Sequence, residues 1–211
     1  VLYFDLIYGK DKHRGGAMQD DVGKIQMPER ITEALRNAVD TKLLWIGEDM
    51  LSKAPAMFTT LFPGERACMV GDCNTLSAAG REEYSSLRAA GVELVQPYIF
   101  NEPPYASIEA AETVRGYLSG NNAVAVAVGS GSINDICKLA SFRVGRKYMC
   151  VATAASVDGY ASSGAPMTIE GFKKTVPCPA PAGIIADLLV LQRAPYDMTA
   201  AGYADLLAKV T

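Results

Sequence analysis

A glycine-rich turn separates an apolar run from a helical pattern in the segment AVAVAVGSGSINDICK, residues 123–138. The glycines of Gly129–Ser132 would let the backbone approach a pyrophosphate closely, and a helix beginning there would offer free N–H groups and the positive end of its dipole. Ser132 could cap that helix or bind a phosphate oxygen, and Asp135 in the first turn would stabilise it. The pattern indicates a dinucleotide diphosphate site. A tight turn without a ligand is the alternative, and the turn alone does not separate the two.

Two other polar segments also follow expected strands. Asp72, within MVGDCNT, could accept hydrogen bonds from an adenosine ribose, or it could cap the helix that begins there. The segment TAASVDGYAS, residues 153–162, supplies hydroxyls and the carboxylate of Asp158, although a generic Ser/Thr loop has a similar composition. Because ligands of open α/β sheets bind beyond the carboxyl ends of the strands, we expect all these segments at one edge of a sheet.

The elements that must position these residues alternate along the chain. Strands are expected at 42–47, 66–71, 92–97, 123–128 and 147–152, and helices at 28–39, 49–61, 74–90, 107–118 and 133–144. This alternation predicts a doubly wound α/β domain with a parallel sheet. After residue 153, short strands are expected at 168–169 and 175–176, and a new helical pattern begins at Pro195.

The domain organisation follows from this change of pattern. We expect a nucleotide-binding α/β domain over residues 1–190 and the start of an all-helical domain over 191–211, with the rest of that domain cut off at Thr211.

Composition narrows the function classes. Hydrophobic residues make up 49% of the 211, which allows a sizeable core, and 20 Lys+Arg against 23 Asp+Glu disfavours a nucleic-acid partner. No stretch approaches the ~20 apolar residues of a membrane span, and Val1–Tyr8 is too short for a signal sequence. Five widely spaced cysteines without a CxxC pair indicate reduced thiols in a cytoplasmic protein. The single histidine, His13, lies in a polar loop, so a multi-histidine metal site cannot be completed here.

Four segments together resemble the sn-glycerol-1-phosphate dehydrogenases: GSGSINDICK, TAASVDGYASS, KKTVPCPAPAGIIADLLVLQRAP and AAGYADLLAK. These enzymes belong to a wider group of iron-containing alcohol dehydrogenases, glycerol dehydrogenases and dehydroquinate synthase-like proteins. The resemblance is nearly continuous from residue 123 onward, looser over 42–120 and absent from the first thirty residues. It implies a dehydroquinate synthase-like fold and the NAD(P)-dependent reduction of dihydroxyacetone phosphate to sn-glycerol 1-phosphate.

The resemblance also implies roles for individual residues. Those implied to bind NAD(P) are Asp72 at the adenosine ribose, Gly131, Ser132, Ile133, Asn134 and Asp135 at the diphosphate, Thr153, Ala154, Ala155 and Ser156 on the nicotinamide side, and Ser162. Asp158 would contact the substrate. Asp205 would contact the substrate and ligate a divalent metal, with two histidines beyond Thr211 completing the ligand set. Zinc suits an Asp/His/His set, with nickel or iron as alternatives.

This sequence departs from the family pattern at two positions. Ser130 replaces the commoner middle glycine, a change that the turn should accept. Lys209 lies one turn after Asp205, where related alcohol dehydrogenases carry a histidine, and this favours the branch that uses a phosphorylated substrate.

Other interpretations of the sequence stand beside this one. The implied protein is a cytoplasmic homo-oligomer that acts on a small phosphorylated molecule, without a membrane span or a nucleic-acid partner. Glycerol dehydrogenase or another enzyme of the same fold is an alternative activity. A non-catalytic nucleotide-binding module is a third interpretation.

Overall fold

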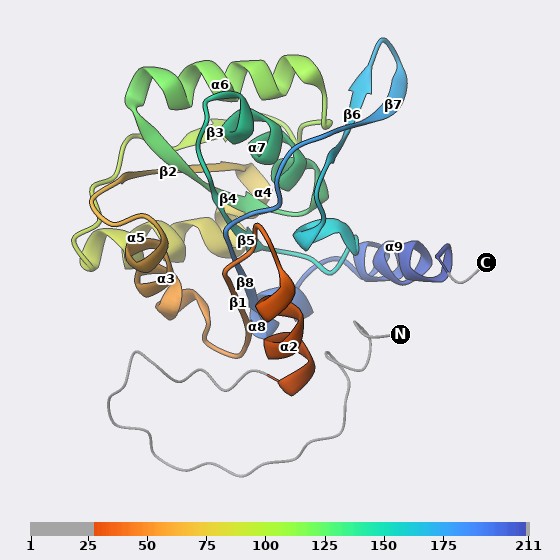
Figure 1. Ribbon diagram of the computed structural model, residues 1–211, viewed down its shortest axis with the longest axis horizontal. Coiled ribbons are helices and arrows are strands. Elements are labelled where there is room, and N and C mark those ends of the chain that lie inside the picture. Colours follow the sequence, from red (N-terminus) through yellow and green to blue (C-terminus); the bar gives the residue numbers. More distant parts are fainter. Residues whose placement is uncertain (1–27, 210–211) are drawn as a thin grey trace.

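The computed structural model describes residues 28–209 (Figure 1). Its helices are α2 (Glu29–Asn37), α3 (Ala54–Leu61), α4 (Cys73–Thr75), α5 (Arg81–Ala89), α6 (Ile108–Asn121), α7 (Gly131–Arg143), α8 (Leu188–Gln192) and α9 (Tyr196–Leu207). Its strands are β1 (Leu43–Gly47), β2 (Arg66–Asp72), β3 (Tyr98–Phe100), β4 (Ala123–Gly129), β5 (Met149–Ala152), β6 (Ala165–Ile169), β7 (Phe172–Val176) and β8 (Gly183–Asp187). Short 3-10 turns span Leu51–Lys53 and Gly159–Ala161, and a π-helical turn spans Leu76–Gly80. Val1–Tyr8 and His13 lie outside the described residues.

The main sheet has six strands in the order β1-β8-β5-β4-β2-β3, and β6 pairs with β7 as a separate antiparallel hairpin. Every pair of neighbours in the main sheet is parallel. The predicted α/β fold with a parallel sheet is therefore confirmed. Within residues 28–209, no helix is long and apolar enough to cross a membrane.

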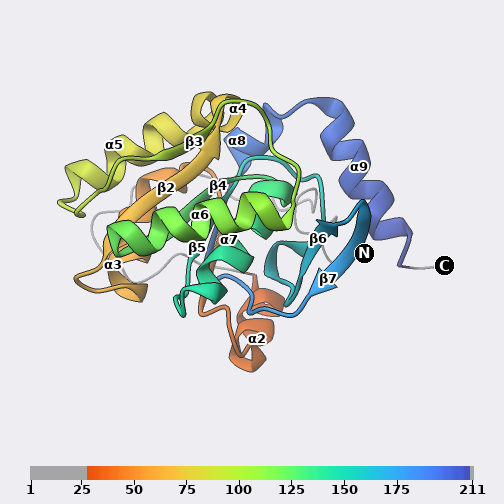
Figure 2. The same cartoon turned by 90° about the horizontal axis from the view of Figure 1, so that it is seen from above.

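Strand β4 lies in the middle of the sheet and is covered on both faces. Its alanines, Ala123, Ala125 and Ala127, belong to the core formed with α6 and α7, whereas its valines pack into the core formed with α3 and α5 (Figure 2). Side chains alternate between the two faces of a strand, so the alternation of alanine and valine puts only small side chains on one face and larger ones on the other. The small face lets α7 lie close to the sheet.

The order of the strands reverses between β2 and β4. Strand β2 continues through α4 and α5 to β3 at the sheet edge, while β4 continues through α7 to β5 in the opposite direction. The two strands run in register from Arg66 beside Ala123 to Val70 beside Ala127, so Asp72 and Gly129 end them side by side. Such a reversal leaves a crevice at the carboxyl ends, where ligands of open α/β sheets bind.

Two expected elements differ from the structure, and two observed elements were not expected. The strand expected at 92–97 is wrong, because only Leu94 bridges to Ala67 there and the regular ladder begins at Tyr98. Pro97 has no N–H to donate, and the register slips by one residue across it. The helix expected at 74–90 is interrupted by the π-helical turn. Strand β8 and helix α8 were not expected, because their residues follow a proline-rich stretch.

Candidate functional site

Most residues singled out in the sequence line two neighbouring cavities at the carboxyl edge of the sheet. The first, named here the β2–β4 pocket, has a volume of about 710 Å³ and includes Asp72, Ser130, Thr153, Ala154 and Arg193. The second, named the α7–α9 pocket, has a volume of about 410 Å³. Its lining includes the predicted residues Gly131, Ser132, Asn134, Asp135, Asp158, Ser162 and Asp205. The structure therefore divides the predicted site between two cavities that meet at the start of α7.

The turn between β4 and α7 is as tight as its glycines indicate. A Cβ atom on Gly129 would lie 2.5 Å from the Cβ of Ile133, and one on Gly131 would lie 3.2 Å from a methyl group of Val157. Ser130 occupies the N-cap position, but its side chain accepts no cap hydrogen bond, and Ser132 lies inside the helix. The first N–H groups of a helix have no intrahelical acceptor, so this uncapped end presents them to the crevice.

Asp72 performs the capping role that the sequence left open. Its Oδ1 accepts hydrogen bonds from the N–H groups of Asn74 and Thr75, both at 2.9 Å, while the Thr75 hydroxyl accepts from the Asp72 N–H. The side chain is buried at the floor of the β2–β4 pocket. Within residues 28–209, Oδ2 accepts no hydrogen bond. A ribose contact through that oxygen stays a prediction, compatible with the cap.

Helix α9 brings the carboxylate of Asp205 to the α7–α9 pocket, and Lys209 follows just after the helix ends at Leu207. Asp205 Oδ2 accepts a hydrogen bond from the N–H of Asp158 at 3.0 Å, and Lys209 Nζ lies 2.5 Å from Asp158 Oδ2. This hydrogen bond to Asp158 raises the pKa of Lys209. The carboxylate of Asp158 thus has its charge partly balanced, whereas that of Asp205 has an N–H as its partner.

Gly202 seats α9 on this loop and was not predicted from the sequence. A Cβ atom there would lie 2.0 Å from the carbonyl oxygen of Ala155, so the helix backbone packs directly against the loop backbone. The signal available in the sequence was the glycine inside the helical pattern AAGYADLLAK.

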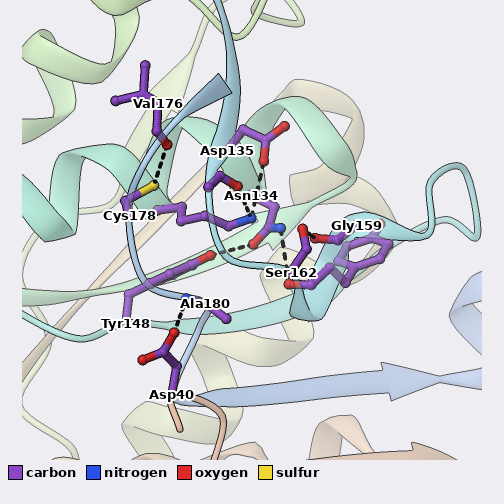
Figure 3. A network of polar contacts seen from close by, with 12 residues as sticks. Asp40, Asn134, Asp135, Tyr148, Gly159, Ser162, Val176, Cys178 and Ala180 are labelled. Carbon is purple, nitrogen blue, oxygen red and sulfur yellow. Dashed lines mark hydrogen bonds and ion pairs between the residues drawn. The ribbon is translucent and has the colours of Figure 1, made fainter. Parts of the chain in front are cut away.

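A buried polar network holds α7 against the loop after β5 (Figure 3). The Tyr148 hydroxyl donates to Asn134 Oδ1 at 2.7 Å, and Asn134 Nδ2 donates to the carbonyl of Tyr160 at 3.5 Å. The Tyr160 hydroxyl in turn donates to the carbonyl of Ala154 at 2.7 Å. The Asn134 side chain is therefore used within the protein, and its part in the site is to position the loop.

Lys138 extends this network and was also not predicted from the sequence. Its buried ammonium donates to the carbonyl of Gly164 at 3.1 Å and to Asp135 Oδ1 at 3.5 Å. Burial raises the pKa of Asp135 to about 6, while the positive charges of Lys138 and Lys173 oppose that rise. Asp135 thus lines the α7–α9 pocket as a carboxylate that takes up a proton at a higher pH than an exposed aspartate does.

Of the remaining predicted residues, three do not line either cavity with their side chains and one does. Ile133 is a core residue with 2% of its surface exposed, so only its backbone is available to a ligand. Ala155 and Ser156 belong to the lining of neither pocket. The Ser162 hydroxyl donates to the carbonyl of Gly159 at 2.8 Å within the lining of the α7–α9 pocket.

Metal-binding side chains do not gather into a site within the described part of the chain. No group of three or more His, Cys, Asp or Glu residues within 28–209 could hold a metal ion. Asp205 is one carboxylate at the pocket, and a catalytic zinc needs three protein ligands. Further ligands would therefore have to come from outside the described residues.

Comparison with known proteins relates this chain to one family of dehydrogenases. The profile of the iron-containing alcohol dehydrogenase family matches residues 45–195. Curated relatives named glycerol-1-phosphate dehydrogenase (NAD(P)+) include one from Bacillus velezensis, 39% identical over 68% of this chain and 37% of the relative. Another, from Methanoculleus marisnigri, is 29% identical over 84% of this chain and 50% of the relative. The chain thus spans half or less of the length of these relatives.

Solved structures show the same fold. Glycerol dehydrogenase from Schizosaccharomyces pombe superposes with a TM-score of 0.69 at 21% identity, covering 82% of this chain and 44% of that one. An iron-containing alcohol dehydrogenase from Thermococcus thioreducens superposes with a TM-score of 0.69 at 16% identity, covering 81% and 51%.

Proposed function

The chain belongs to the iron-containing alcohol dehydrogenase family, and we propose that the protein is a metal- and NAD(P)-dependent glycerol-1-phosphate dehydrogenase. In this reaction a hydride passes from the nicotinamide to the carbonyl carbon of dihydroxyacetone phosphate, and a proton adds to the carbonyl oxygen. The product is sn-glycerol 1-phosphate. The names of the curated relatives at 34–46% identity support this substrate.

The observation that carries the cofactor assignment is the uncapped start of α7 beside Asp72 at the strand-order reversal. Backbone N–H groups of the first turn of α7 would bind the diphosphate, and Asp72 Oδ2 would accept from the ribose hydroxyls. A carboxylate at this position repels a 2′-phosphate, which favours NAD over NADP. Thr153 and Ala154, at the end of β5, would line the path of the cofactor toward the second cavity.

The α7–α9 pocket would hold the substrate. Asp158, oriented by its N–H bond to Asp205 and paired with Lys209, would contact the substrate hydroxyl groups. Asp205 would contribute one ligand to a divalent metal, for which we propose zinc, with nickel or iron as alternatives. A metal bound there would polarise the substrate carbonyl. The protein's own contribution is to orient the reactants and exclude water.

The cofactor assignment is tested by calorimetric titration of the chain with NADH. Gly131→Val should abolish binding, because its branched side chain would fill the approach to the turn beside Val157. Gly116→Val is the matched control, since a Cβ atom on Gly116 would meet no neighbouring atom within 4 Å. Both variants are first checked for folding by circular dichroism. Equal NADH affinity in wild type and a folded Gly131→Val protein would refute the site.

The substrate assignment is tested on the complete gene product. We expect it to reduce dihydroxyacetone phosphate far faster than it oxidises glycerol. Comparable efficiency for glycerol and glycerol 1-phosphate would instead make the protein a glycerol dehydrogenase, the activity named for one of its structural neighbours. NADH binding without either activity would leave a nucleotide-binding module.

Three broader assignments accompany this function. We propose that α9 begins a helical domain after an α/β domain that ends near residue 190, because α9 leaves the sheet after Pro195. We propose a cytoplasmic location, supported by five free cysteines, four of them buried. We also propose that the protein is a homo-oligomer and that it has no nucleic-acid partner.

A further inference from the structure

The β6–β7 hairpin carries a lysine to the α7–α9 pocket. In the hairpin register Lys173 stands opposite Thr168, so the two side chains share a face. Pro166, Thr168 and Lys173 all line the pocket, whereas Met167 on the other face is fully buried in the core. The alternation of the strands therefore turns Lys173 toward the cavity and Lys174 away from it.

The base of this hairpin is fixed to the body of the domain. The N–H of Gly164 donates to the carbonyl of Cys178 at 2.7 Å, and the carbonyl of Gly164 accepts from Lys138. The N–H of Thr168 donates to the carbonyl of Ala106 at 2.7 Å. Because Thr168 is the cross-strand partner of Lys173, these hydrogen bonds also fix the backbone position of the lysine.

The other charges of the α7–α9 pocket have partners. Of the charged side chains that line it, Asp135 pairs with Lys138 beneath the pocket wall and Asp158 pairs with Lys209. The carboxylate of Asp205 accepts the N–H of Asp158. Lys173 enters no ion pair or hydrogen bond through its side chain within residues 28–209, although its charge reaches Asp135. Of the two lysines described in this lining, Lys209 is paired with a carboxylate, so the ammonium group of Lys173 is the one available to an anionic ligand.

We propose that Lys173 binds a phosphoryl group in the α7–α9 pocket. A lysine ammonium is a compact point charge suited to phosphate oxygens, and the uncapped first turn of α7 faces the same cavity through Gly131 and Ser132. Both features select a ligand with negatively charged oxygens. On the proposed function, that group is either the phosphate of the substrate or the diphosphate of the cofactor.

The test measures binding to the chain, not turnover. Wild type, Lys173→Gln, Lys173→Arg and Lys174→Gln are titrated with inorganic pyrophosphate, glycerol 1-phosphate and NADH at low ionic strength. Lys173→Gln should weaken pyrophosphate binding by about tenfold, Lys173→Arg should restore most of it, and Lys174→Gln should match wild type. The difference should shrink in concentrated salt, because the lysine is solvent-accessible.

The two organic ligands identify the source of the phosphoryl group. A loss confined to glycerol 1-phosphate assigns Lys173 to the substrate, and a loss confined to NADH assigns it to the cofactor; either supports the proposal. Equal effects of Lys173→Gln and Lys174→Gln, or no pyrophosphate binding by wild type, would overturn it. If wild type binds pyrophosphate through Lys173 but does not bind NADH, the proposed cofactor site fails while the phosphoryl site stands.

Discussion

Glu83 in α5 is a buried carboxyl group, and replacing it with glutamine should stabilise the protein at neutral pH. The residue has 0% of its surface exposed, and neither carboxyl oxygen has a hydrogen-bond partner among residues 28–209. Burial raises the pKa of Glu83 from 4.5 to about 8, and the neighbouring charge of Glu82 adds to the rise. The folded protein therefore favours the protonated, neutral side chain.

The sign and size of the effect follow from proton linkage. Below pH 4.5 the group is protonated in the folded and unfolded states, so its ionisation costs nothing. Between pH 4.5 and about 8 the unfolded chain releases a proton that the folded chain retains, so the free energy of unfolding falls as pH rises. Each pK unit corresponds to about 1.4 kcal/mol, so at pH 7 the loss is about 3 kcal/mol.

The assay is urea unfolding of wild type, Glu83→Gln and the exposed control Glu82→Gln at pH 5 and pH 8. We expect Glu83→Gln to lie within about 1 kcal/mol of wild type at pH 5 and to exceed it by about 4 kcal/mol at pH 8, less the cost of burying an unpaired amide. Glu82→Gln should shift the curves little at either pH. A stability difference between Glu83→Gln and wild type that does not change with pH would refute the assigned ionisation.

Other predictions follow from the site. Gly202→Ala should cost about 3 kcal/mol or displace α9, because its Cβ would lie 2.0 Å from the Ala155 carbonyl, whereas Gly116→Ala should be neutral or slightly stabilising; urea unfolding and limited proteolysis compare the two. Asp72→Asn should keep the α4 cap and raise NADP+ affinity relative to NAD+ severalfold, and an unchanged ratio in calorimetry would remove Asp72 from the ribose site. In the complete gene product, Asp205→Asn should keep NADH binding but lose more than about tenfold in metal affinity together with most of kcat. Metal content by mass spectrometry beside turnover decides this, and retention of both would make Asp205 an ordinary helix residue.

Local patterns in the sequence were enough to predict most of the individual units of this protein, although they gave a wrong strand at 92–97 and missed β8. The apolar run, glycine turn and helix of residues 123–143 could be predicted because all three signals lie within about twenty residues and act through local backbone geometry. The α/β class followed from the repetition of such units. The likeness to a dehydrogenase family followed from short segments whose residue types are specific.

Which distant segments meet was settled by tertiary packing. It placed β8 between β1 and β5, and it set Asp72 beside the glycine turn by pairing β2 with β4. It also joined Asp158 to Asp205 across 47 residues and turned Lys173 toward their pocket. Strand order and helix docking depend on long-range packing of whole faces, for which a local pattern carries no information. The location of the predicted site residues at one sheet edge could be predicted, because most of them directly follow parallel strands. Their division between two pockets and the charge pairing among them depend on long-range packing, so neither could be predicted.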